Sequence, residues 1–549
     1  MGASSQISAR SKARMEKSGM GRPNRCLLIL GFVVFWWVIF FFNFLSIATP
    51  SEDGASSSRS IHIPFFSSRR EPLKSSYPSP GKLSPSPVRR VEFTPLNEHL
   101  WKPLKMFGAR DDRCAGRYVY VHRLPRDLNE GMLDDCQHLS LWTNMCKFTG
   151  NAGLGPPLED KDNAFSDRGW YATNQFAVEV IFHNRMKQYD CLTNDSSIAA
   201  AIFVPYYAGL DISRYLWGVN VSTRDSGALR MVDWLVRQPE WRRMGGRDHF
   251  MVAGRITWDF RRKTEKEDDW GNKLFIIPEV KNITSLVIEA SPWHFNDFAI
   301  PYPTYFHPTQ DSDVVDWQVR MRGMERPALF SFAGAPRQQL RKSIRERIMD
   351  QCRESPQCKL LECDFGESKC HVPSAVMKLF EESVFCLQPQ GDSFTRRSIF
   401  DSMLAGCIPV FFHPDSAYSQ FVWHLPRNHR KYSVFISEID IRRGNVSIES
   451  VLRQIPADEV LRMREEVIQL IPRLLYADPR QRLESMQDAF DVAVEAVIDK
   501  NANLRTALLQ GKDDDELRKL HKPEGAETDE LDGSEESIRR WQSQAGRKK

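Results

Sequence analysis

Two blocks of alternating apolar and amphipathic segments make up the middle of the chain. In the first block, residues 117–124, 197–207 and 249–255 are apolar runs of strand length. Between these runs, residues 174–189 and 228–238 place apolar side chains at helical spacing. The order strand, helix, strand, helix, strand predicts a parallel sheet with helices on both faces.

The pattern restarts after a proline-rich connection at residues 301–312. Strands of this second block are predicted at residues 326–337, 359–365 and 408–412, and helices at residues 339–352 and 395–407. Residues 374–389 are predicted to form a helix followed by a strand. We therefore predict an α/β fold of two facing Rossmann-like domains, residues 111–310 and 311–510, with a cleft between them. Ligands of such sheets bind beyond the carboxyl ends of the strands, where strand order reverses.

Residues 26–48 form an uninterrupted apolar segment without a charged side chain, long enough to cross a bilayer as a helix. Basic residues dominate the segment before it, so the positive-inside rule places residues 1–25 in the cytosol and the rest in a lumen. A cleaved signal peptide is the alternative, although its apolar region is usually shorter. Residues 49–110 are predicted to be a flexible stem, and residues 511–549 a charged, disordered tail.

Composition indicates an oxidising compartment and disfavours one class of partner. A net charge of +4 gives no general case for binding nucleic acid. Ten of the 11 cysteines follow the apolar segment, and an even number favours disulfides. A zinc cluster is the alternative, but the cysteines do not form two CxxC pairs. Spacing suggests the pairs Cys136–Cys146 and Cys363–Cys370, and N-glycosylation sequons that agree with a lumenal address occur at Asn194, Asn220, Asn282 and Asn445.

The segment richest in candidate chemistry lies between the last two predicted strands, at residues 387–412. Arg396 and Arg397 would lie in the first turn of its helix, where lone cations oppose the helix dipole unless an anion is bound. Three residues suited to the N-cap precede them: Asp392, Ser393 and Thr395. We interpret Arg396 or Arg397 as a clamp for a nucleotide diphosphate, held without a metal.

Two neighbouring features extend this interpretation. Asp401 shares a helix face with the arginines and could accept hydrogen bonds from ribose hydroxyls. An intrahelical Arg–Asp salt bridge is the structural alternative. Gly334 and Arg337 follow the first strand of the second block, where a glycine turn before a helix permits close approach of a phosphate. An ordinary strand-to-helix turn is the alternative there.

The resemblance to a known family rests on several long motifs. They include CAGRYVYVHRLP, GWYATNQFAVEVIFHNRM, GGRDHFMVAGRITWDFRR, FSFAGAPR and LQPQGDSFTRRSIFDSMLAGCIPVFF. Over roughly residues 114–490 the chain resembles the plant exostosin-like glycosyltransferases of glycosyltransferase family 47. The nearest group is that of the xyloglucan galactosyltransferases of the MURUS/KATAMARI type.

The resemblance implies a GT-B fold, a type II membrane enzyme of the Golgi apparatus with its catalytic part in the lumen, and inversion at the sugar carbon. It implies transfer of β-galactose from UDP-galactose to xylosyl side chains of xyloglucan, in cell-wall biosynthesis. No cofactor is expected, and a metal is not required. Donor contacts would fall on Gly334, Arg337, Ser393, Arg396, Arg397 and Asp401. Expected partners are the two substrates, the Golgi membrane and other Golgi glycosyltransferases, with no nucleic acid.

Inverting sugar transfer needs a general base that deprotonates the acceptor hydroxyl. Residues 245–262 place three chemically able side chains around one strand, namely Asp248, His249 and Asp259. A structural hydrogen bond is the alternative for each, and His122 is a weaker candidate. Asp311 and Asp313 match the metal-binding DxD pattern, but they lie in a connection that closes no buried strand, so we expect no metal there.

Two alternatives remain open at this stage. Arg123 follows His122 where relatives usually carry an acidic residue, so another donor sugar, galacturonate or arabinose, is an alternative to galactose. The other alternative is a non-catalytic Golgi scaffold, which would have no need of a phosphate clamp.

Overall fold

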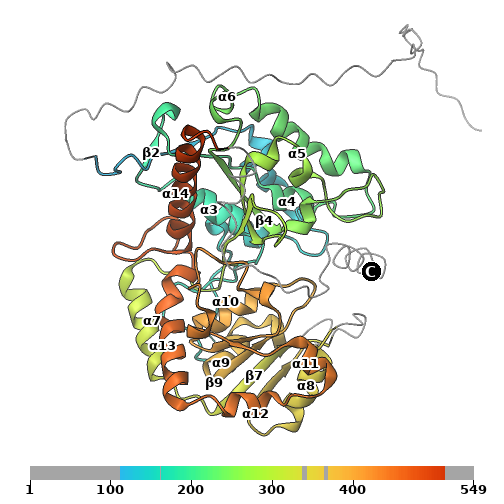
Figure 1. Ribbon diagram of the computed structural model, residues 1–549, viewed down its shortest axis with the longest axis vertical. Coiled ribbons are helices and arrows are strands. Elements are labelled where there is room, and N and C mark those ends of the chain that lie inside the picture. The colour runs from blue at the N-terminus through green and yellow to red at the C-terminus, as the bar shows by residue number, and fades with distance from the viewer. Residues whose placement is uncertain (1–111, 161, 337–342, 364–368, 513–549) are drawn as a thin grey trace, which may run out of the picture. The chain divides into compact units, whose positions relative to one another are not determined.

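The computed structural model describes residues 112–160, 162–336, 343–363 and 369–512 (Figure 1). The predicted cytosolic tail at 1–25, membrane anchor at 26–48 and stem at 49–110 lie outside these residues, as does the charged tail after residue 512. Among the helices of the described residues, none is long and apolar enough to cross a membrane.

The amino-terminal half of the described chain forms a parallel sheet in the order β2-β1-β3-β4-β5-β6. Residues of the interior strands β4 and β5 are buried almost without exception, as expected where helices cover both faces of a parallel sheet. Strand order reverses between β1 and β3, which marks a ligand-binding edge. The strands are β1 (Val119–Val121), β2 (Leu192–Thr193), β3 (Ala201–Phe203), β4 (His249–Ile256), β5 (Thr284–Glu289) and β6 (Asp297–Ala299).

Short helices connect these strands. Helices α3 and α4 pack on β4, and α4 also contacts α5 (Figure 1). The α-helices are α2 (Cys146–Thr149), α3 (Val178–Met186), α4 (Ala208–Ser213), α5 (Val221–Leu235) and α6 (Trp241–Met244). The 3-10 helices are η2 (Arg126–Leu128), η3 (Glu130–His138), η4 (Asn151–Gly153), η5 (Ser196–Ile198), η6 (Thr257–Phe260), η7 (Leu274–Ile276) and η8 (Val280–Asn282).

The second sheet is also parallel and has the order β11-β10-β9-β7-β8. Its strand order reverses between β7 and β9, so the switch point lies at the carboxyl ends of these two strands. The strands are β7 (Ala328–Gly334), β8 (Cys358–Glu362), β9 (Ser383–Gln388), β10 (Ile408–Phe411) and β11 (Val434–Phe435). The prediction of two parallel α/β sheets is therefore confirmed.

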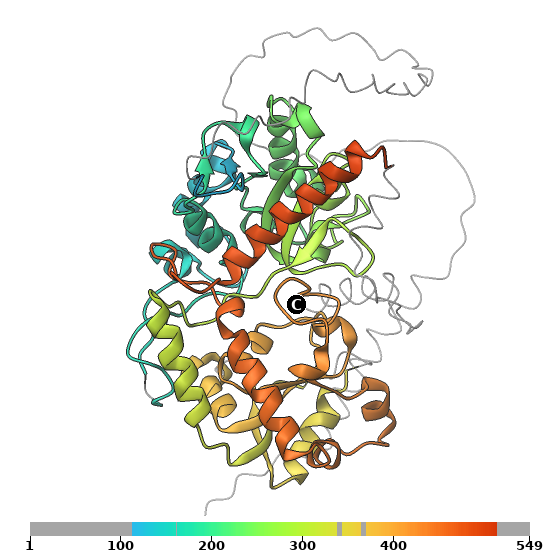
Figure 2. The ribbon, with the colours of Figure 1, turned by 60° about the vertical axis from the view of Figure 1, so that its left-hand side comes forward.

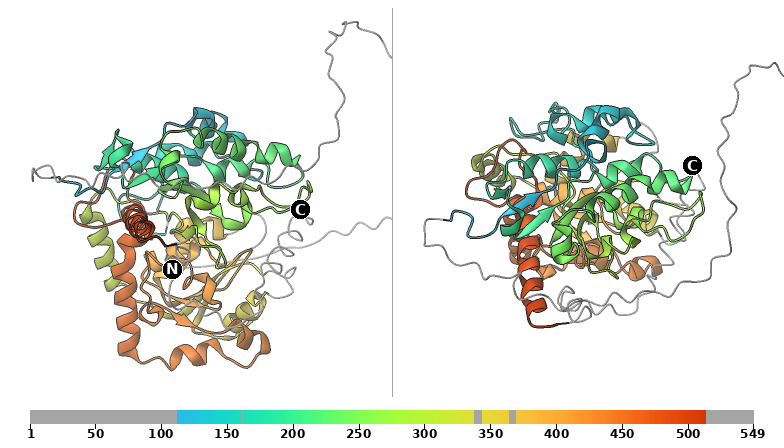
Figure 3. Two further views of the ribbon diagram at one scale, coloured as in Figure 1. Left: turned by 45° about the horizontal axis from the view of Figure 1, so that its top comes forward. Right: turned by 90° about the horizontal axis from the view of Figure 1, so that it is seen from above.

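Helices α7 and α13 run side by side next to the second sheet (Figure 3). The fully buried Trp317 of α7 donates its indole N–H to the carbonyl of Leu404 at 2.8 Å, which fixes the end of α10. The helices of this half are α7 (Asp311–Gly323), α8 (Arg345–Glu354), α9 (Pro373–Glu381), α10 (Arg397–Leu404), α11 (Glu438–Arg443), α12 (Ile448–Arg453) and α13 (Ala457–Leu474), with η9 (Lys369–His371), η10 (Pro414–Ser416) and η11 (His429–Lys431).

Helix α14 (Ala489–Leu509) returns to the first sheet, and Figure 2 shows it alongside those strands. Asn501 donates to the carbonyls of Ala200 and Asp248, and the Lys500 ammonium bonds the Thr284 hydroxyl at 2.9 Å. Its apolar face joins the core of the first sheet. Residues 489–509, which belong to the predicted second domain, thus pack on the first sheet.

Every cysteine in the described residues lies in a disulfide. The two pairs suggested by spacing, Cys136–Cys146 and Cys363–Cys370, are confirmed. No cysteine of the described residues therefore has a thiolate with which to bind zinc, the alternative to disulfides. The remaining pairs are Cys114–Cys191, Cys352–Cys358 and Cys386–Cys407.

The sequons differ in accessibility. Asn194, Asn220 and Asn445 are exposed, as glycan attachment requires. Asn282 is half-buried, and its side-chain amide nitrogen donates to the carbonyl of Gly245 at 2.9 Å. Because this nitrogen is the atom that would carry a glycan, Asn282 is the least suited of the four sequons.

Candidate active site

The candidate site begins at the switch point of the second sheet. Strand β7 ends at Gly334, and residues 389–396, called here the 389–396 loop, connect β9 to α10. A Cβ on Gly334 would lie 2.5 Å from the ring of Phe332, so the turn does not accommodate a side chain without rearrangement. The predicted donor contact Arg337 lies outside the described residues.

Arg345 bridges the ends of β7 and β9 and was missed by the sequence reasoning. Its Nε donates to the carbonyl of Gln390 at 2.9 Å, and its Nη1 donates to the carbonyl of Ala335 at 3.3 Å. The side chain is buried at the first position of α8. A fixed cation beside a helix N-terminus favours a bound anion, so Arg345 joins the candidate diphosphate contacts.

Arg396 supplies a second cation at the same edge. Its Nε donates to the carbonyl of Pro389 at 3.1 Å, and its guanidinium lies over Gly391. A Cβ on Gly391 would lie 0.8 Å from Nη2 of Arg396, so the glycine makes room for this guanidinium.

The start of α10 differs from the prediction. The helix begins at Arg397, with Arg396 as its N-cap and no side-chain hydrogen bond at the cap. Thr395, one of the predicted N-cap residues, instead contacts the first sheet. Arg396 therefore belongs to the 389–396 loop, whereas Arg397 is the first residue of the helix.

Arg397 and Asp401 form the intrahelical ion pair that was the structural alternative. The distance from Nε of Arg397 to Oδ2 of Asp401 is 3.2 Å, and both side chains are largely buried. Arg397 also donates to the carbonyl of Thr173 and stacks on Tyr305, with its guanidinium carbon 3.5 Å from the ring centroid. Burial raises the pKa of Asp401 to about 6, although Arg397 opposes this shift. These contacts explain both residues without a nucleotide.

Glu289 joins the first sheet to the 389–396 loop. It is the last residue of β5 and fully buried, and its Oε2 accepts the backbone N–H of Thr395 at 2.7 Å and the hydroxyl of Thr395 at 2.8 Å. Burial raises the pKa of Glu289, and the nearby Ser393, Thr395 and Trp258 oppose the shift. The carboxyl ends of the two sheets therefore meet at this carboxylate.

Two further contacts hold the same loop. The phenol of Tyr302 and the hydroxyl of Thr395 lie 3.1 Å apart, and Phe394 stacks on His413 with ring centroids 4.7 Å apart. The loop is thus fixed to the first sheet through Thr395 and to the second through Phe394. This arrangement places Ser393 and Arg396 between the two sheet edges.

Asp259 lies at the carboxyl end of β4, in η6, where the predicted base belongs. Both of its carboxylate oxygens are occupied, however. Oδ2 accepts from Nε of Arg255 at 2.5 Å, and Oδ1 accepts from the indole N–H of Trp270 at 2.6 Å. The carboxylate is buried and satisfied, which fits a structural role.

Asp248 and His249 lie at the opposite end of β4. His249 is its first residue, and its Nδ1 bonds Oδ1 of Asp248 at 2.8 Å. Its Nε2 is 3.2 Å from Nε2 of His122, whose pKa is lowered to about 3 chiefly by burial. Burial alone would raise the pKa of Asp248, but the bond to His249 and nearby arginines lower it. All three side chains are buried. Asp248 and His249 lie at the amino end of β4, whereas His122 follows the carboxyl end of β1.

The DxD carboxylates are used within the fold. Asp311 accepts the backbone N–H groups of Glu484 and Ser485. Asp313 forms a capping box at the start of α7 and pairs with Arg168 at 2.8 Å. Within the described part of the chain, no group of three or more His, Cys, Asp or Glu side chains is arranged to hold a metal ion.

Comparison with known proteins decides the family. The Exostosin GT47 domain matches residues 113–452 of this chain. The chain belongs to the exostosin GT47 family. Its membership makes it a glycosyltransferase, and the matched region includes both parallel sheets, the 389–396 loop and Glu289.

Two relatives in this family come from Arabidopsis thaliana. Xyloglucan galactosyltransferase MUR3 is 57% identical over 530 residues, which cover 91% of this chain and 86% of that protein. Probable xyloglucan galactosyltransferase GT12 is 49% identical over 409 residues, covering 73% and 80%. A solved structure, the GtfA/B complex, overlaps 62% of this chain and 64% of its own at 11% identity, but its TM-score of 0.29 supports no argument.

Proposed function

We propose that this member of the GT47 family is an inverting β-galactosyltransferase that uses UDP-galactose and acts on the xylosyl side chains of xyloglucan. The observation that carries the proposal is the 57% identity to Xyloglucan galactosyltransferase MUR3 over nearly the whole of both chains. The structure contributes the meeting of two parallel-sheet edges at one loop, which suits a nucleotide-sugar donor on one side and an acceptor on the other.

On the donor side, we propose that Arg345, Arg396 and the N-terminus of α10 hold the diphosphate. These groups are fixed before the reaction by bonds to Gln390, Ala335 and Pro389, so they require little reorganisation when charge develops on the leaving UDP. A metal is not required in this scheme, because the two guanidinium groups neutralise the leaving group.

On the acceptor side, we propose Glu289 as the general base. It lies at the end of β5 against the donor loop, and its raised pKa favours uptake of a proton. The acceptor hydroxyl would lose its proton to Glu289 as its oxygen bonds the anomeric carbon, while the bond from that carbon to UDP breaks. The contacts from Thr395 would have to open for the acceptor to reach the carboxylate.

We also propose a type II Golgi membrane protein with its catalytic part in the lumen. The apolar segment at 26–48 and the basic residues before it support this topology. The five disulfides of the described residues support an oxidising compartment.

The test uses the full-length protein in detergent, xyloglucan oligosaccharides and a panel of UDP-sugars, with and without EDTA. Mass spectrometry should show one hexose added from UDP-galactose, and EDTA should not prevent it. Loss of activity with EDTA would contradict the metal-free scheme, and preference for UDP-galacturonate or UDP-arabinose would contradict the donor. No transfer from any donor by folded protein would favour a scaffold.

Two variants test the base. Glu289→Gln should lower turnover by more than about a hundredfold, within the range expected for a general base, with little change in the donor KM. Asp259→Asn serves as the comparison, since its carboxylate is bonded to Arg255 and Trp270 and should affect stability more than turnover. A Glu289→Gln protein with wild-type turnover would remove Glu289 from the mechanism.

A further inference from the structure

Three indole rings form a column in which Trp217 and Trp270 are stacked and Trp142 is tilted by 33° against Trp217. The rings of Trp217 and Trp270 are nearly parallel, at 9°, with centroids 5.0 Å apart. Trp142 continues the column, with its centroid 5.6 Å from that of Trp217. Trp142 ends the column with 47% of its surface exposed, whereas the two rings behind it are half-buried.

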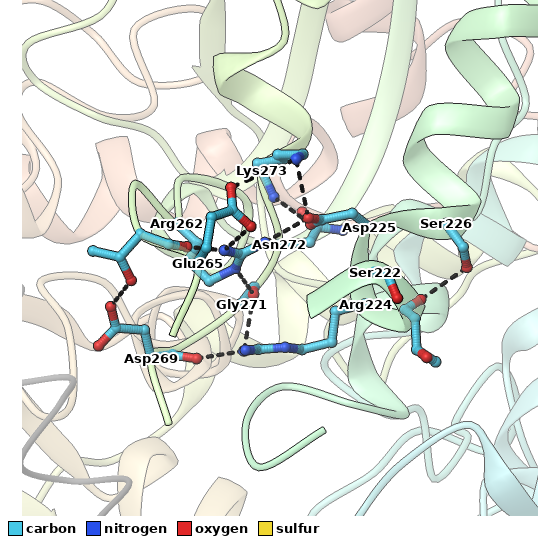
Figure 4. A network of polar contacts seen from close by, with 12 residues as sticks. Ser222, Arg224, Asp225, Ser226, Arg262, Glu265, Asp269, Gly271, Asn272 and Lys273 are labelled. Carbon is cyan, nitrogen blue, oxygen red and sulfur yellow. Dashed lines mark hydrogen bonds and ion pairs between the residues drawn. The ribbon is translucent and has the colours of Figure 1, made fainter. Parts of the chain in front are cut away.

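Two buried arginines hold the segment that carries Trp270 (Figure 4). Residues 263–269 are mostly charged and would not order themselves by burying apolar surface. Arg224 is only 1% exposed and donates to backbone carbonyls of this segment and its surroundings. Arg262 donates to the carbonyls of Thr264 and Gly271 and pairs with Asp225 at 2.5 Å. The carbonyls bound by Arg224 belong to Leu216, Lys266, Glu267, Asp269 and Gly271.

The exposed end of the column is also anchored. Trp142 lies in the short loop closed by the disulfide between Cys136 and Cys146. The segment from residue 137 to 145 is therefore restrained at both ends, which lowers the entropy lost when a ligand contacts it. A large exposed aromatic ring on a covalently restrained loop suits a binding surface better than a core.

The column connects directly to the candidate active site. The indole N–H of Trp270 donates to Asp259, which lies in η6 at the carboxyl end of β4. The neighbouring residue Trp258 lies close enough to Glu289, the proposed base, to lower the pKa of that carboxyl. Adjacent residues of one short helix thus contact the proposed base on one side and the aromatic column on the other.

We propose that Trp142, supported by Trp217 and Trp270, is a stacking site for a sugar ring of the acceptor's β-glucan backbone, away from the xylose that receives galactose. This inference rests on the proposed acceptor. The C–H faces of a β-linked pyranose are apolar and flat, so they stack on an indole. Leu141 and Trp142 make a small exposed apolar patch, which fits one sugar ring better than the roughly 800 Å² per partner that a protein interface buries.

The matched variants are Trp142→Ala, Trp142→Phe and Leu141→Ala, all in the full-length protein. Leu141 is the adjacent residue and is exposed to 46%, so it controls for loss of apolar surface in the same loop. With long xyloglucan oligosaccharides, Trp142→Ala should raise the acceptor KM about five- to tenfold, as loss of one aromatic contact predicts. The turnover and the KM for UDP-galactose should stay within about twofold, and Trp142→Phe should restore most of the affinity.

An acceptor oligosaccharide too short to reach the column distinguishes sugar stacking on Trp142 from a structural role of this residue. With a single xylosylated repeat, Trp142→Ala should have the wild-type KM. An equal rise for short and long acceptors, an equal effect of Leu141→Ala, or an unchanged KM for both would overturn the proposal.

A binding experiment separates this inference from the proposed reaction. Calorimetric titration of long xyloglucan oligosaccharides without a donor should show weaker binding to Trp142→Ala than to wild type, with equal melting temperatures. If wild type transfers a different sugar but this difference persists, the proposed donor is wrong and the stacking site stands. If wild type transfers galactose and Trp142→Ala binds normally, the stacking site is wrong and the function stands.

Discussion

Arg397→Ala should destabilise the protein, although the sequence pairs Arg397 with Arg396 as if the two were equivalent. The side chain of Arg397 is 12% exposed and that of its partner Asp401 is 5% exposed. Arg397 also bonds the carbonyl of Thr173 and stacks on Tyr305. Its removal leaves a buried carboxylate and a buried carbonyl without their donor.

The expected loss is large because breaking a buried ion pair on one side costs about 3–5 kcal/mol. Protonation of Asp401 limits this loss, since its pKa is already raised to about 6 and would rise further without the guanidinium. We therefore expect the free energy of unfolding to fall by about 4 kcal/mol at pH 8. At ~2 cal/mol/K per residue, unfolding of several hundred residues makes this a fall of about 5 °C in melting temperature.

The pH dependence has a defined sign. A carboxyl whose folded pKa is raised binds its proton more tightly in the native state, so stability falls as pH rises from the unfolded pKa of about 4 through the folded value. In Arg397→Ala this window extends upward, because the folded pKa of Asp401 is higher. The variant should therefore lie closer to wild type at pH 5 than at pH 8.

The assay is thermal unfolding of the full-length protein in detergent at pH 5 and pH 8, beside turnover at neutral pH. Arg396→Ala is the matched control, because Arg396 lies in the loop before α10, where its Nε donates to the carbonyl of Pro389. It should lose turnover while its melting temperature falls by less than about 2 °C. An Arg397→Ala protein with wild-type stability and a raised donor KM would refute this reasoning and restore Arg397 as a phosphate clamp.

Three further changes test other parts of the structure. Glu381 is buried, neither of its carboxylate oxygens has a hydrogen bond within the described residues, and burial raises its pKa to about 7. The stability conferred by its protonated form is therefore lost as pH rises from about 4.5 through 7. Glu381→Gln should melt higher than wild type at pH 8 and at the same temperature at pH 5, and parallel pH profiles of the two melting temperatures would contradict this. Gly391→Ala should displace the Arg396 guanidinium and lower turnover more than about tenfold at an unchanged melting temperature, whereas normal turnover would remove Arg396 from donor binding. His249→Ala should lower the melting temperature by breaking the buried contacts to Asp248 and His122, with turnover of the folded fraction nearly unchanged; a stable, inactive variant would return His249 to the role of base.

Much of the fold could be predicted because most core strands are apolar runs. Strand β5 was missed because three of its six residues, Thr284, Ser285 and Glu289, are polar although all are fully buried. Glu289 was missed with it, since its significance depends on contact with Thr395 more than a hundred residues later. Local hydrophobicity cannot report such a contact.

The candidate site was predicted in part. Arg396 and Ser393 do lie at the switch point of the second sheet, as the motif before α10 indicated. Asp248 and His249 adjoin a strand, but sequence does not say which strand end they occupy, and they occupy the amino end. The spacing of Arg397 and Asp401 fits an ion pair and a ligand contact equally, and only their burial against Tyr305 separates the two.

The return of α14 to the first sheet imposes an order on biosynthesis. Phe490, Val494 and Val497 belong to a core that the strands of the first sheet share with residues between 399 and 476, so the amino-terminal half cannot finish folding when its own strands have been made. It must wait until about two hundred more residues have been synthesised, with its surface under α14 exposed meanwhile. A chain cut short before residue 489 would therefore leave apolar side chains of this core exposed to water.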